Sequence, residues 1–251
     1  MIDLRGRRAL VTGGSRGIGE AVALMLARCG ASVAIGYRSR AADARTVADR
    51  LRATGVTAAA HDGDISTAEG AEALVQAAEQ SLGGLDIFVG NAGVWPSAEE
   101  AVTELPDARW RRTMAENVDG MFFSTRAAAR RMGQGGRIVL VSSTAGQRGE
   151  AMHADYAASK GAMISFVKSL AVELAPRGIT VNSVAPGWVD TEMTADAMAD
   201  GGRARIAASI PVGRVATAAD IAFPIVCLCA AEARHVTGEI VNVNGGSVLC
   251  G

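Results

Sequence analysis

The sequence has few aromatic residues and almost no net charge, and both shortages exclude classes of protein. Phe, Trp and Tyr make up 4% of the 251 residues, so the core must be built from Ala, Val, Leu and Ile, and no base-stacking surface for nucleic acid is expected. A formal net charge of −1 gives no global attraction to nucleic acid or to an anionic membrane. The basic clusters at 5–8, 109–112 and 126–131 are short, and we interpret them as solvated faces.

The four cysteines and three histidines show no spacing of a disulfide framework or of a metal site. Cys227 and Cys229 stand in an apolar run with no second Cys/His pair to complete a zinc site, and His153 is interpreted as a loop residue. No apolar stretch long enough for the core of a signal peptide precedes the first glycines. We therefore expect a cytoplasmic protein with reduced cysteines and no metal.

Short apolar runs alternate with longer helical patterns along the whole chain. Apolar runs at 8–12, 32–37, 56–61, 85–90, 137–143, 179–186 and 238–246 are typical of buried parallel strands. Segments with helical periodicity lie at 17–29, 41–54, 67–82, 107–132, 155–176 and 217–231. This alternation predicts an α/β fold: one Rossmann-like, doubly wound parallel sheet of about seven strands with helices on both faces, in a single domain over 1–251. Residues 187–216 break the rhythm and form a candidate substrate lid.

A glycine-rich turn joins the first predicted strand to the first predicted helix. The segment Thr12-Gly13-Gly14-Ser15-Arg16-Gly17-Ile18-Gly19 lets the backbone turn sharply and approach a pyrophosphate, whose charge the helix N-terminus then meets. A glycine turn of purely structural value is the alternative. Its position between the first strand and the first helix favours the dinucleotide site.

Two arginines flank the position expected for the adenosine ribose. An NAD site would carry an acid at the end of the second strand, where this chain has Tyr37-Arg38-Ser39. Arg38 could grip a 2′-phosphate bidentately, and Arg16 could approach it from the glycine turn. Unless both are ordinary surface arginines, this pairing predicts NADP rather than NAD.

Three further polar segments follow strands of the predicted parallel sheet, where ligands bind in such folds. They are GNAG at 90–93, SSTAG at 142–146 and APGWVDT at 185–191, and DYAASKG at 155–161 opens a helix nearby. In that helix Tyr156 and Lys160 share one face, and an ammonium beside a phenol favours the phenolate. With Ser143 at the strand end, these groups predict acid–base chemistry on a carbonyl or alcohol, with hydride carried by nicotinamide.

The chain resembles the short-chain dehydrogenases/reductases over nearly its whole length, in a set of motifs: Thr12-Gly13-x-x-x-Gly17-x-Gly19, Asn91-Ala92-Gly93, Ser143, Tyr156-x-x-x-Lys160 and Pro186-Gly187. The resemblance implies that Tyr156 is the general acid/base and that Ser143 orients the substrate oxygen. It implies that Lys160 binds the nicotinamide ribose and lowers the pKa of Tyr156. The backbone carbonyl of Asn117 would position a water in a proton relay to Lys160.

The same resemblance assigns the cofactor site and a tetramer. The implied NADP(H)-binding residues are Gly13, Ser15, Arg16, Gly17, Ile18, Gly19, Tyr37, Arg38, Ser39, Asp64, Ile65, Asn91, Ala92, Gly93, Tyr156, Lys160, Pro186, Gly187, Val189 and Thr191. Around Ser143, the expected substrate pocket comprises Val94, Trp95, Gln147, Met152 and Trp188. The helices predicted at 107–132 and 155–176 would pack against partner copies in a homotetramer.

Within the family the sequence is most similar to 3-oxoacyl-acyl-carrier-protein reductases of fatty acid biosynthesis. Such enzymes present two basic residues near the active-site mouth to receive the acidic carrier. Arg177 matches one of them, but Gln134 stands where the other is expected. Arg130 and Arg131 are the residues that could substitute for it. We therefore predict an NADPH-dependent reductase of a 3-oxoacyl thioester, with acyl carrier protein as a candidate partner. Other ketone or alcohol substrates, such as a sugar, a steroid-like alcohol or a small xenobiotic, stay open, as does a non-catalytic NADP-binding protein.

Overall fold

The computed structural model describes residues 2–249, so Cys250 of the four cysteines lies outside the described residues. Its strands are β1 (Arg8–Thr12), β2 (Ser32–Tyr37), β3 (Ala58–Asp62), β4 (Ile87–Gly90), β5 (Arg137–Val141), β6 (Thr180–Pro186) and β7 (Ile240–Val243). The main helices are α1 (Gly17–Arg28), α2 (Ala41–Arg52), α3 (Ala68–Leu82), α4 (Asp107–Met114), α5 (Gly120–Arg131), α6 (Thr144–Arg148), α7 (Ala154–Leu174), α8 (Ala195–Met198), α9 (Gly202–Ser209) and α10 (Ala218–Cys229).

The seven strands form one parallel sheet in the order β3-β2-β1-β4-β5-β6-β7. Strands β1, β2, β4, β5 and β6 are buried almost throughout, as their continuous apolar runs predict. The edge strands β3 and β7 are only half-buried, because each has a neighbour on one side alone. The predicted doubly wound parallel sheet is confirmed.

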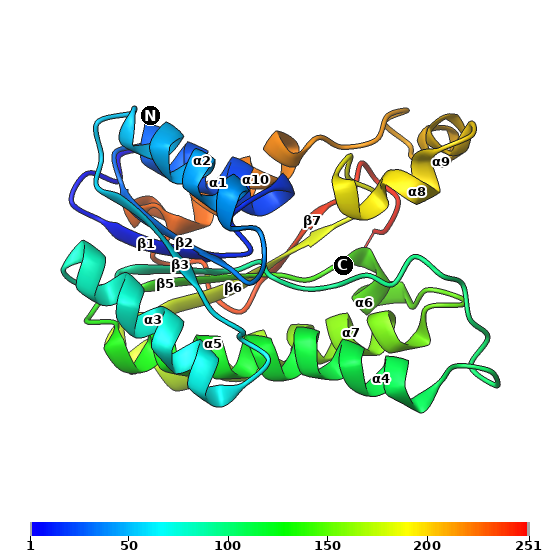
Figure 1. Cartoon of the computed structure of the whole chain (residues 1–251), viewed down its shortest axis with the longest axis horizontal. Helices are drawn as coiled ribbons and strands as arrows, with labels where there is room; N and C mark the ends of the chain where they lie inside the picture. Colours follow the sequence, from blue (N-terminus) through cyan, green and yellow to red (C-terminus); the bar gives the residue numbers. More distant parts are fainter. Residues whose placement is uncertain (1, 250–251) are drawn as a thin grey trace.

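Two helical layers cover the two faces of the sheet (Figure 1). One apolar cluster packs α1, α2 and α10 on one face, and a second packs α3, α5 and α7 on the other. Strands β2 and β3 lie on one side of β1, and β4 to β7 lie on its other side. The direction in which successive strands are added to the sheet therefore reverses between β1 and β4. A crevice at that reversal, beyond the carboxyl ends of the strands, is where an open parallel sheet binds ligands. No helix within residues 2–249 is long and apolar enough to cross a membrane.

The helix predicted over 107–132 is interrupted. Between α4 and α5 the chain makes a π-helical turn, Ala115–Asp119, which the periodicity of the sequence did not indicate. The fifth predicted strand ends at Val141 rather than at residue 143, because Ser143 accepts a hydrogen bond from the N–H of Ala145 and caps the short helix α6. The segment 187–216 contains the 3₁₀ turn Glu192–Thr194 with α8 and α9, so it is a folded excursion and not a plain loop.

Candidate active site

A cavity of about 360 Å³ opens at the carboxyl ends of the central strands. It runs from the glycine turn after β1, past the ends of β4 and β5, to the segment that follows β6. Apart from Gly19, Asn117, Gln147 and Met152, every residue predicted from the sequence for the cofactor or substrate site lines it. The separate strand ends therefore meet in one place, as their order along the sheet requires.

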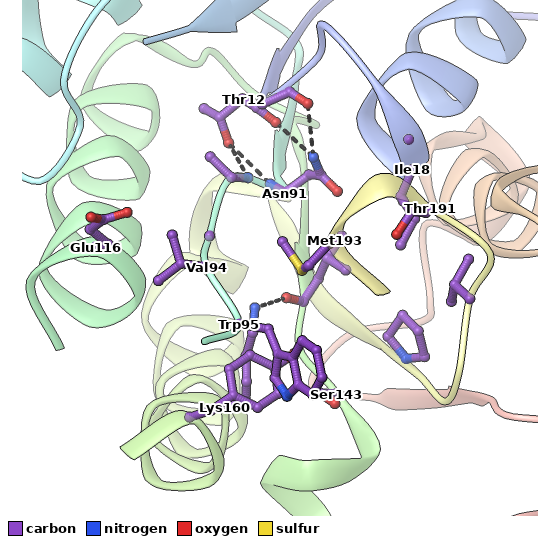
Figure 2. Close-up of a pocket in the computed structure, with 18 of the residues that line it drawn as sticks. Thr12, Ile18, Asn91, Val94, Trp95, Glu116, Ser143, Lys160, Thr191 and Met193 are labelled. Atoms are coloured by element: carbon purple, nitrogen blue, oxygen red, sulfur yellow. Dashed lines mark hydrogen bonds between the residues drawn. The ribbon is translucent and has the colours of Figure 1, made fainter. Parts of the chain in front are cut away.

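Hydrogen bonds between β1 and β4 hold the glycine turn in shape (Figure 2). The Thr12 hydroxyl accepts from the backbone N–H groups of Asn91 and Ala92 at 3.0 and 3.1 Å, and the Asn91 side-chain amide donates to the carbonyl oxygens of Thr12 and Gly13 at 3.0 and 3.2 Å. Gly13 has a φ of 63°, in the region that glycine favours. Gly19 is buried against the Gly13 carbonyl, where a side chain would not fit, so it supports the turn without lining the cavity.

Three arginines lie at the end of the cavity where the ribose phosphate is expected, and each is held by a carboxylate. Arg16 pairs with Glu192 at 2.5 Å, Arg40 with the same carboxylate at 2.9 Å, and Arg38 with Glu116 at 3.3 Å. All five side chains line the cavity. Arg40 and both acids were missed by the sequence analysis; the position of Arg40, two residues after Arg38, is the signal that would have found it.

Ser143, Tyr156 and Lys160 meet at the centre of the cavity. The Ser143 hydroxyl lies near enough to the Tyr156 phenol to lower its pKa, and the Lys160 ammonium lies 5.8 Å from the centroid of the Tyr156 ring. Lys160 donates a hydrogen bond to the carbonyl oxygen of Val141 at 2.8 Å, the last residue of β5 (Figure 2). The helix α7 thus presents an acid and an ammonium on one face, beside a serine from the neighbouring strand end.

The expected lowering of the Tyr156 pKa by Lys160 is wrong for this arrangement. Burial raises the pKa of Tyr156 to about 12; the Ser143 hydroxyl opposes this increase and the Glu150 carboxylate adds to it. Burial also lowers the pKa of Lys160 to about 8. The ammonium is directed to Val141 instead of the phenol oxygen, so desolvation decides the pKa of both groups.

Asn117 lies in the π-helical turn, and its side chain connects the loop after β4 to helix α7. Its amide oxygen accepts from the N–H of Val94 at 2.8 Å, and its amide nitrogen donates to the Val94 carbonyl and to the Ser159 hydroxyl, both at 3.0 Å. Ser159 in turn donates to the carbonyl oxygen of Tyr156 at 2.7 Å. π-Helical turns inside helices are frequent at functional sites, which agrees with a role here.

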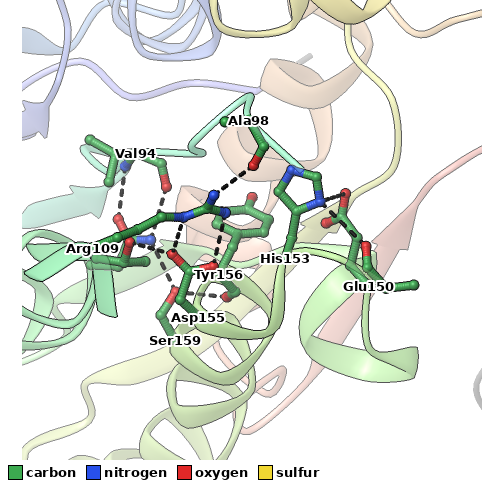
Figure 3. A network of polar contacts seen from close by, with 11 residues as sticks. Val94, Ala98, Arg109, Glu150, His153, Asp155, Tyr156 and Ser159 are labelled. Carbon is green, nitrogen blue, oxygen red and sulfur yellow. Dashed lines mark hydrogen bonds and ion pairs between the residues drawn. The ribbon is translucent and has the colours of Figure 1, made fainter. Parts of the chain in front are cut away.

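The fully buried Asp155 anchors the first turn of α7. Its carboxylate accepts from the Arg109 guanidinium at 3.1 and 3.3 Å and from the Thr113 hydroxyl at 2.8 Å (Figure 3). Arg109 also donates to the carbonyl oxygen of Ala98 at 2.6 Å. Asp155 therefore fixes the residue next to Tyr156 against α4 and against the loop that follows β4.

Two tryptophans line the cavity close to Ser143 and Tyr156, and a buried histidine packs against one of them. Trp95 stacks on His153 with ring centroids 5.0 Å apart and meets Trp188 edge-on at 5.8 Å. His153, interpreted from the sequence as a loop residue, lies in the loop directly before α7 and is buried there. The Glu150 carboxylate, which the sequence analysis did not select, lines the cavity near Tyr156.

Two residues predicted for the substrate pocket lie outside its lining. Gln147 is on the far side of α6, where its side-chain amide donates to the Asn242 side chain of β7 at 2.7 Å. Met152 is 42% exposed, and its carbonyl oxygen accepts from the N–H of Glu100. From the turn between α6 and α7, Glu150 lines the cavity instead.

The basic positions expected near the active-site mouth do not reach it within one chain. Arg177 follows the 21-residue helix α7, so about 30 Å of helix separates it from Tyr156. There it donates hydrogen bonds to the carbonyl oxygens of Ala129 and Met132, which end α5. Arg131 is paired with Glu72 and Glu79 at 2.7 and 3.1 Å.

Known proteins are similar to this chain over nearly its whole length. A family model described as enoyl-(acyl carrier protein) reductase matches residues 13–247. The 3-oxoacyl-acyl-carrier-protein reductase of Vibrio cholerae is 39% identical over 99% of this chain and 100% of its own length. The L-rhamnose 1-dehydrogenase (NAD(P)(+)) of Azotobacter vinelandii is 38% identical over 96% of each chain.

A solved structure of a short-chain dehydrogenase from Burkholderia cenocepacia, in complex with NADP, superimposes with a TM-score of 0.92 at 37% identity, covering 97% of this chain and 98% of that one. Fold, motif geometry and relatives agree over nearly the full length. The chain belongs to the short-chain dehydrogenase/reductase family of oxidoreductases.

Proposed function

We propose that the protein is an NADP(H)-dependent oxidoreductase that reduces a ketone to a secondary alcohol, with Tyr156 as the general acid. The observation that carries the proposal is the meeting of Ser143, Tyr156 and Lys160 in one cavity with the glycine turn and the arginines. NADPH supplies the hydride when bound. The rest of the chemistry is done by side chains of this chain.

Each of these side chains has a distinct role. The Ser143 hydroxyl donates a hydrogen bond to the carbonyl oxygen of the substrate and orients it beside the Tyr156 phenol. As negative charge develops on that oxygen, Tyr156 transfers its proton to it, since an alkoxide is the stronger base. The raised pKa of Tyr156 keeps the proton in place until then. Lys160 holds the nicotinamide ribose, and a water on the Asn117 backbone carbonyl relays protons to Lys160.

The cofactor side favours NADP over NAD. Arg16, Arg38 and Arg40 line one end of the cavity, and guanidinium groups bind a phosphate bidentately. Asp64 and Ile65 lie beside them, where the adenine would rest. The NADP complex of the Burkholderia cenocepacia relative supports this choice.

The relatives supply two candidate substrate classes. The Vibrio cholerae reductase favours a 3-oxoacyl thioester, with acyl carrier protein as the partner and fatty acid biosynthesis as the process. The Azotobacter vinelandii dehydrogenase favours a hydroxylated ketone/alcohol pair of the sugar type, and the Glu150 carboxylate in the cavity favours it as well. The test is the loss of absorbance at 340 nm when NADPH and the protein are mixed with acetoacetyl thioester and, separately, with a panel of ketones. If no ketone oxidises NADPH and no alcohol reduces NADP, the proposal is wrong.

Three further features belong to the proposal. Residues 187–216 act as a substrate lid, since Glu192 and Met193 within them line the cavity. The chain, a single domain, forms a homotetramer: Trp110, Phe122 and Val172 of α4, α5 and α7 are 41%, 39% and 78% exposed, and apolar side chains on these helices would be covered by partner copies. Light scattering of the purified protein measures that state. The expected location is the cytoplasm.

A further inference from the structure

Glu150 occupies an unusual place for a carboxylate, on the wall of the cavity that holds Tyr156. Its side chain is only 25% exposed. The nearest base, His153 Nδ1, is 3.8 Å away, which is too far for a hydrogen bond. Burial raises the pKa of this carboxylate, and the nearby His153 and Trp95 side chains oppose the increase. An ionised carboxylate has about four acceptor positions, and Glu150 lines the cavity, so acceptor positions are available there to a bound molecule.

The turn that carries Glu150 is held in place from several sides. Gly149 and Met152 both have left-handed backbone conformations, with φ of 79° and 66°, and such strain in a non-glycine residue persists only where the surroundings fix it. The Met152 carbonyl accepts from Glu100, which ties the turn to the loop after β4. His153 stacks on Trp95, and its Nε2 atom is buried without a hydrogen-bond partner. The fold therefore fixes a carboxylate in the cavity at a cost in strain and desolvation.

The surrounding charges decide which donor suits this carboxylate. Arg148 and Lys160 line the same cavity, so a cationic substrate would be repelled. An alkyl chain would displace water from Glu150 and leave a buried charge without hydrogen bonds, which is costly. A neutral hydroxyl group satisfies the carboxylate and meets no like charge.

We infer that Glu150 determines substrate specificity, and that the substrate is a ketone bearing a hydroxyl group close to its carbonyl, which donates a hydrogen bond to Glu150. The inference rests on the proposed ketone reduction and, of the two substrate classes, it selects the hydroxylated one. Trp95 and His153 act as positioning residues that hold the carboxylate at the wall.

The test compares ketones of equal size that differ in one hydroxyl group. Hydroxyacetone and 2-butanone form one pair, and 1-hydroxy-2-butanone and 3-pentanone a second, each assayed at 340 nm with saturating NADPH. We expect kcat/KM to be about tenfold to a hundredfold higher for the hydroxylated member, the range for a hydrogen bond to a charged group. Effects of a variant on Tyr156 or on the cofactor act on both ketones and cancel in this ratio.

Substitutions at Glu150 then identify the acceptor. Glu150→Gln keeps the shape but loses the charge and should lower the ratio several-fold, while Glu150→Met removes the acceptor and should bring the ratio to one or below. Glu104→Gln, an exposed change on the loop after β4, should keep the ratio of the unmodified protein. A ratio near one in the unmodified protein, or a ratio that Glu150→Met leaves unchanged, would overturn the inference while leaving ketone reduction intact. An absence of turnover with every ketone and alcohol would overturn the proposed function as well.

A binding measurement separates recognition from chemistry. Hydroxyacetone carries no secondary alcohol for NADP to oxidise, so its dissociation constant is obtained by titration into the protein with saturating NADP, using the fluorescence of Trp95 and Trp188. Glu150→Met should weaken binding of hydroxyacetone about tenfold or more and leave that of 2-butanone within about threefold. Equal weakening of both ketones would indicate a collapsed pocket and would overturn the specific contact.

Discussion

The two halves of the cavity differ in how fully the protein satisfies its own polar groups. In the cofactor half, Thr12 and Asn91 make a closed set of hydrogen bonds, and Arg16 and Arg38 have carboxylate partners. In the substrate half, Glu150 keeps acceptor positions free. Polar groups that hydrogen-bond to one another form a rigid site that suits one type of ligand. A polar group without a hydrogen-bond partner in the protein instead selects a ligand that supplies the hydrogen bond.

Tyr156 stands where the halves meet, and its removal should have the largest effect. Tyr156→Phe deletes the proton donor and keeps the ring, so kcat should fall by about 10²- to 10⁴-fold while the dissociation constant of NADPH changes by less than about threefold. Steady-state assays and a titration of NADPH fluorescence measure the two quantities. An active Phe variant would remove Tyr156 from the role of acid.

In the cofactor half of the cavity, replacing Arg38 should change the preference for NADPH over NADH. Arg38→Asp replaces a phosphate-binding cation with a repelling charge, so the ratio of kcat/KM for NADPH over NADH should fall by about tenfold to a hundredfold. Arg45→Asp makes the same change on the exposed side of α2 and serves as the control. Similar ratios in the two variants would mean that Arg38 does not contact the 2′-phosphate.

Replacing Lys160, which lies where the two halves of the cavity meet, tests whether a residue needed for turnover lowers the stability of the folded protein. A buried amine whose pKa falls from 10.5 to about 8 disfavours the folded state by about 3 kcal/mol at pH 7, and its hydrogen bond to Val141 returns about 1 kcal/mol. Lys160→Met should therefore abolish turnover yet raise the free energy of unfolding by about 2 kcal/mol, measured by urea denaturation.

The difference in the free energy of unfolding between Lys160→Met and the unmodified protein should change with pH in one direction. Between pH 8 and 10.5 the unfolded chain keeps the lysine proton and the folded chain releases it, so the stability of the unmodified protein rises with pH. The advantage of Lys160→Met should shrink from pH 8 to 9, a range that lies below the unfolded pKa of 10.0 and the folded pKa of about 12 of Tyr156. A constant difference over that range would contradict the lowered pKa of Lys160.

The smallest effect is expected at Glu192, which competes with a phosphate for Arg16 and Arg40. These side chains are about half exposed, and such pairs contribute up to about 1 kcal/mol. Glu192→Gln should tighten NADPH binding by up to about fivefold in low salt, with Glu173→Gln on the exposed side of α7 as the control. Weaker binding would mean that Glu192 orients the arginines for the cofactor.

Prediction from the sequence succeeded where a local pattern determines the structure. Buried strands and glycine turns are encoded by neighbouring residues, so the sheet and the Thr12–Gly19 turn were predicted correctly. The substrate half depends on contacts between segments far apart in the chain, such as Trp95 with His153 and Glu100 with Met152. Hydrophobic periodicity in the sequence does not indicate such contacts, so Glu150 was not identified from the sequence.

The same reason explains the error in the pKa of Tyr156. Spacing correctly placed Tyr156 and Lys160 on one face of a helix, but spacing carries no information on burial or on the competing Val141 carbonyl. A pKa depends on both, so its direction required the three-dimensional structure.

The π-helical turn at Ala115–Asp119 makes the length of this segment critical. Buried residues recur at every fourth position through Thr113, Asn117, Met121 and Thr125, a spacing that an unbroken α-helix would rotate away from the core by about 40° at each step. Deleting one residue here would restore α-helical hydrogen bonding and leave the faces of the flanking helices nearly unchanged, because the π-helical turn takes up one extra residue, but it would displace Asn117 from Val94 and Ser159. Insertions and deletions should thus be excluded from residues 115–119, while the exposed loop tips of the same chain tolerate them.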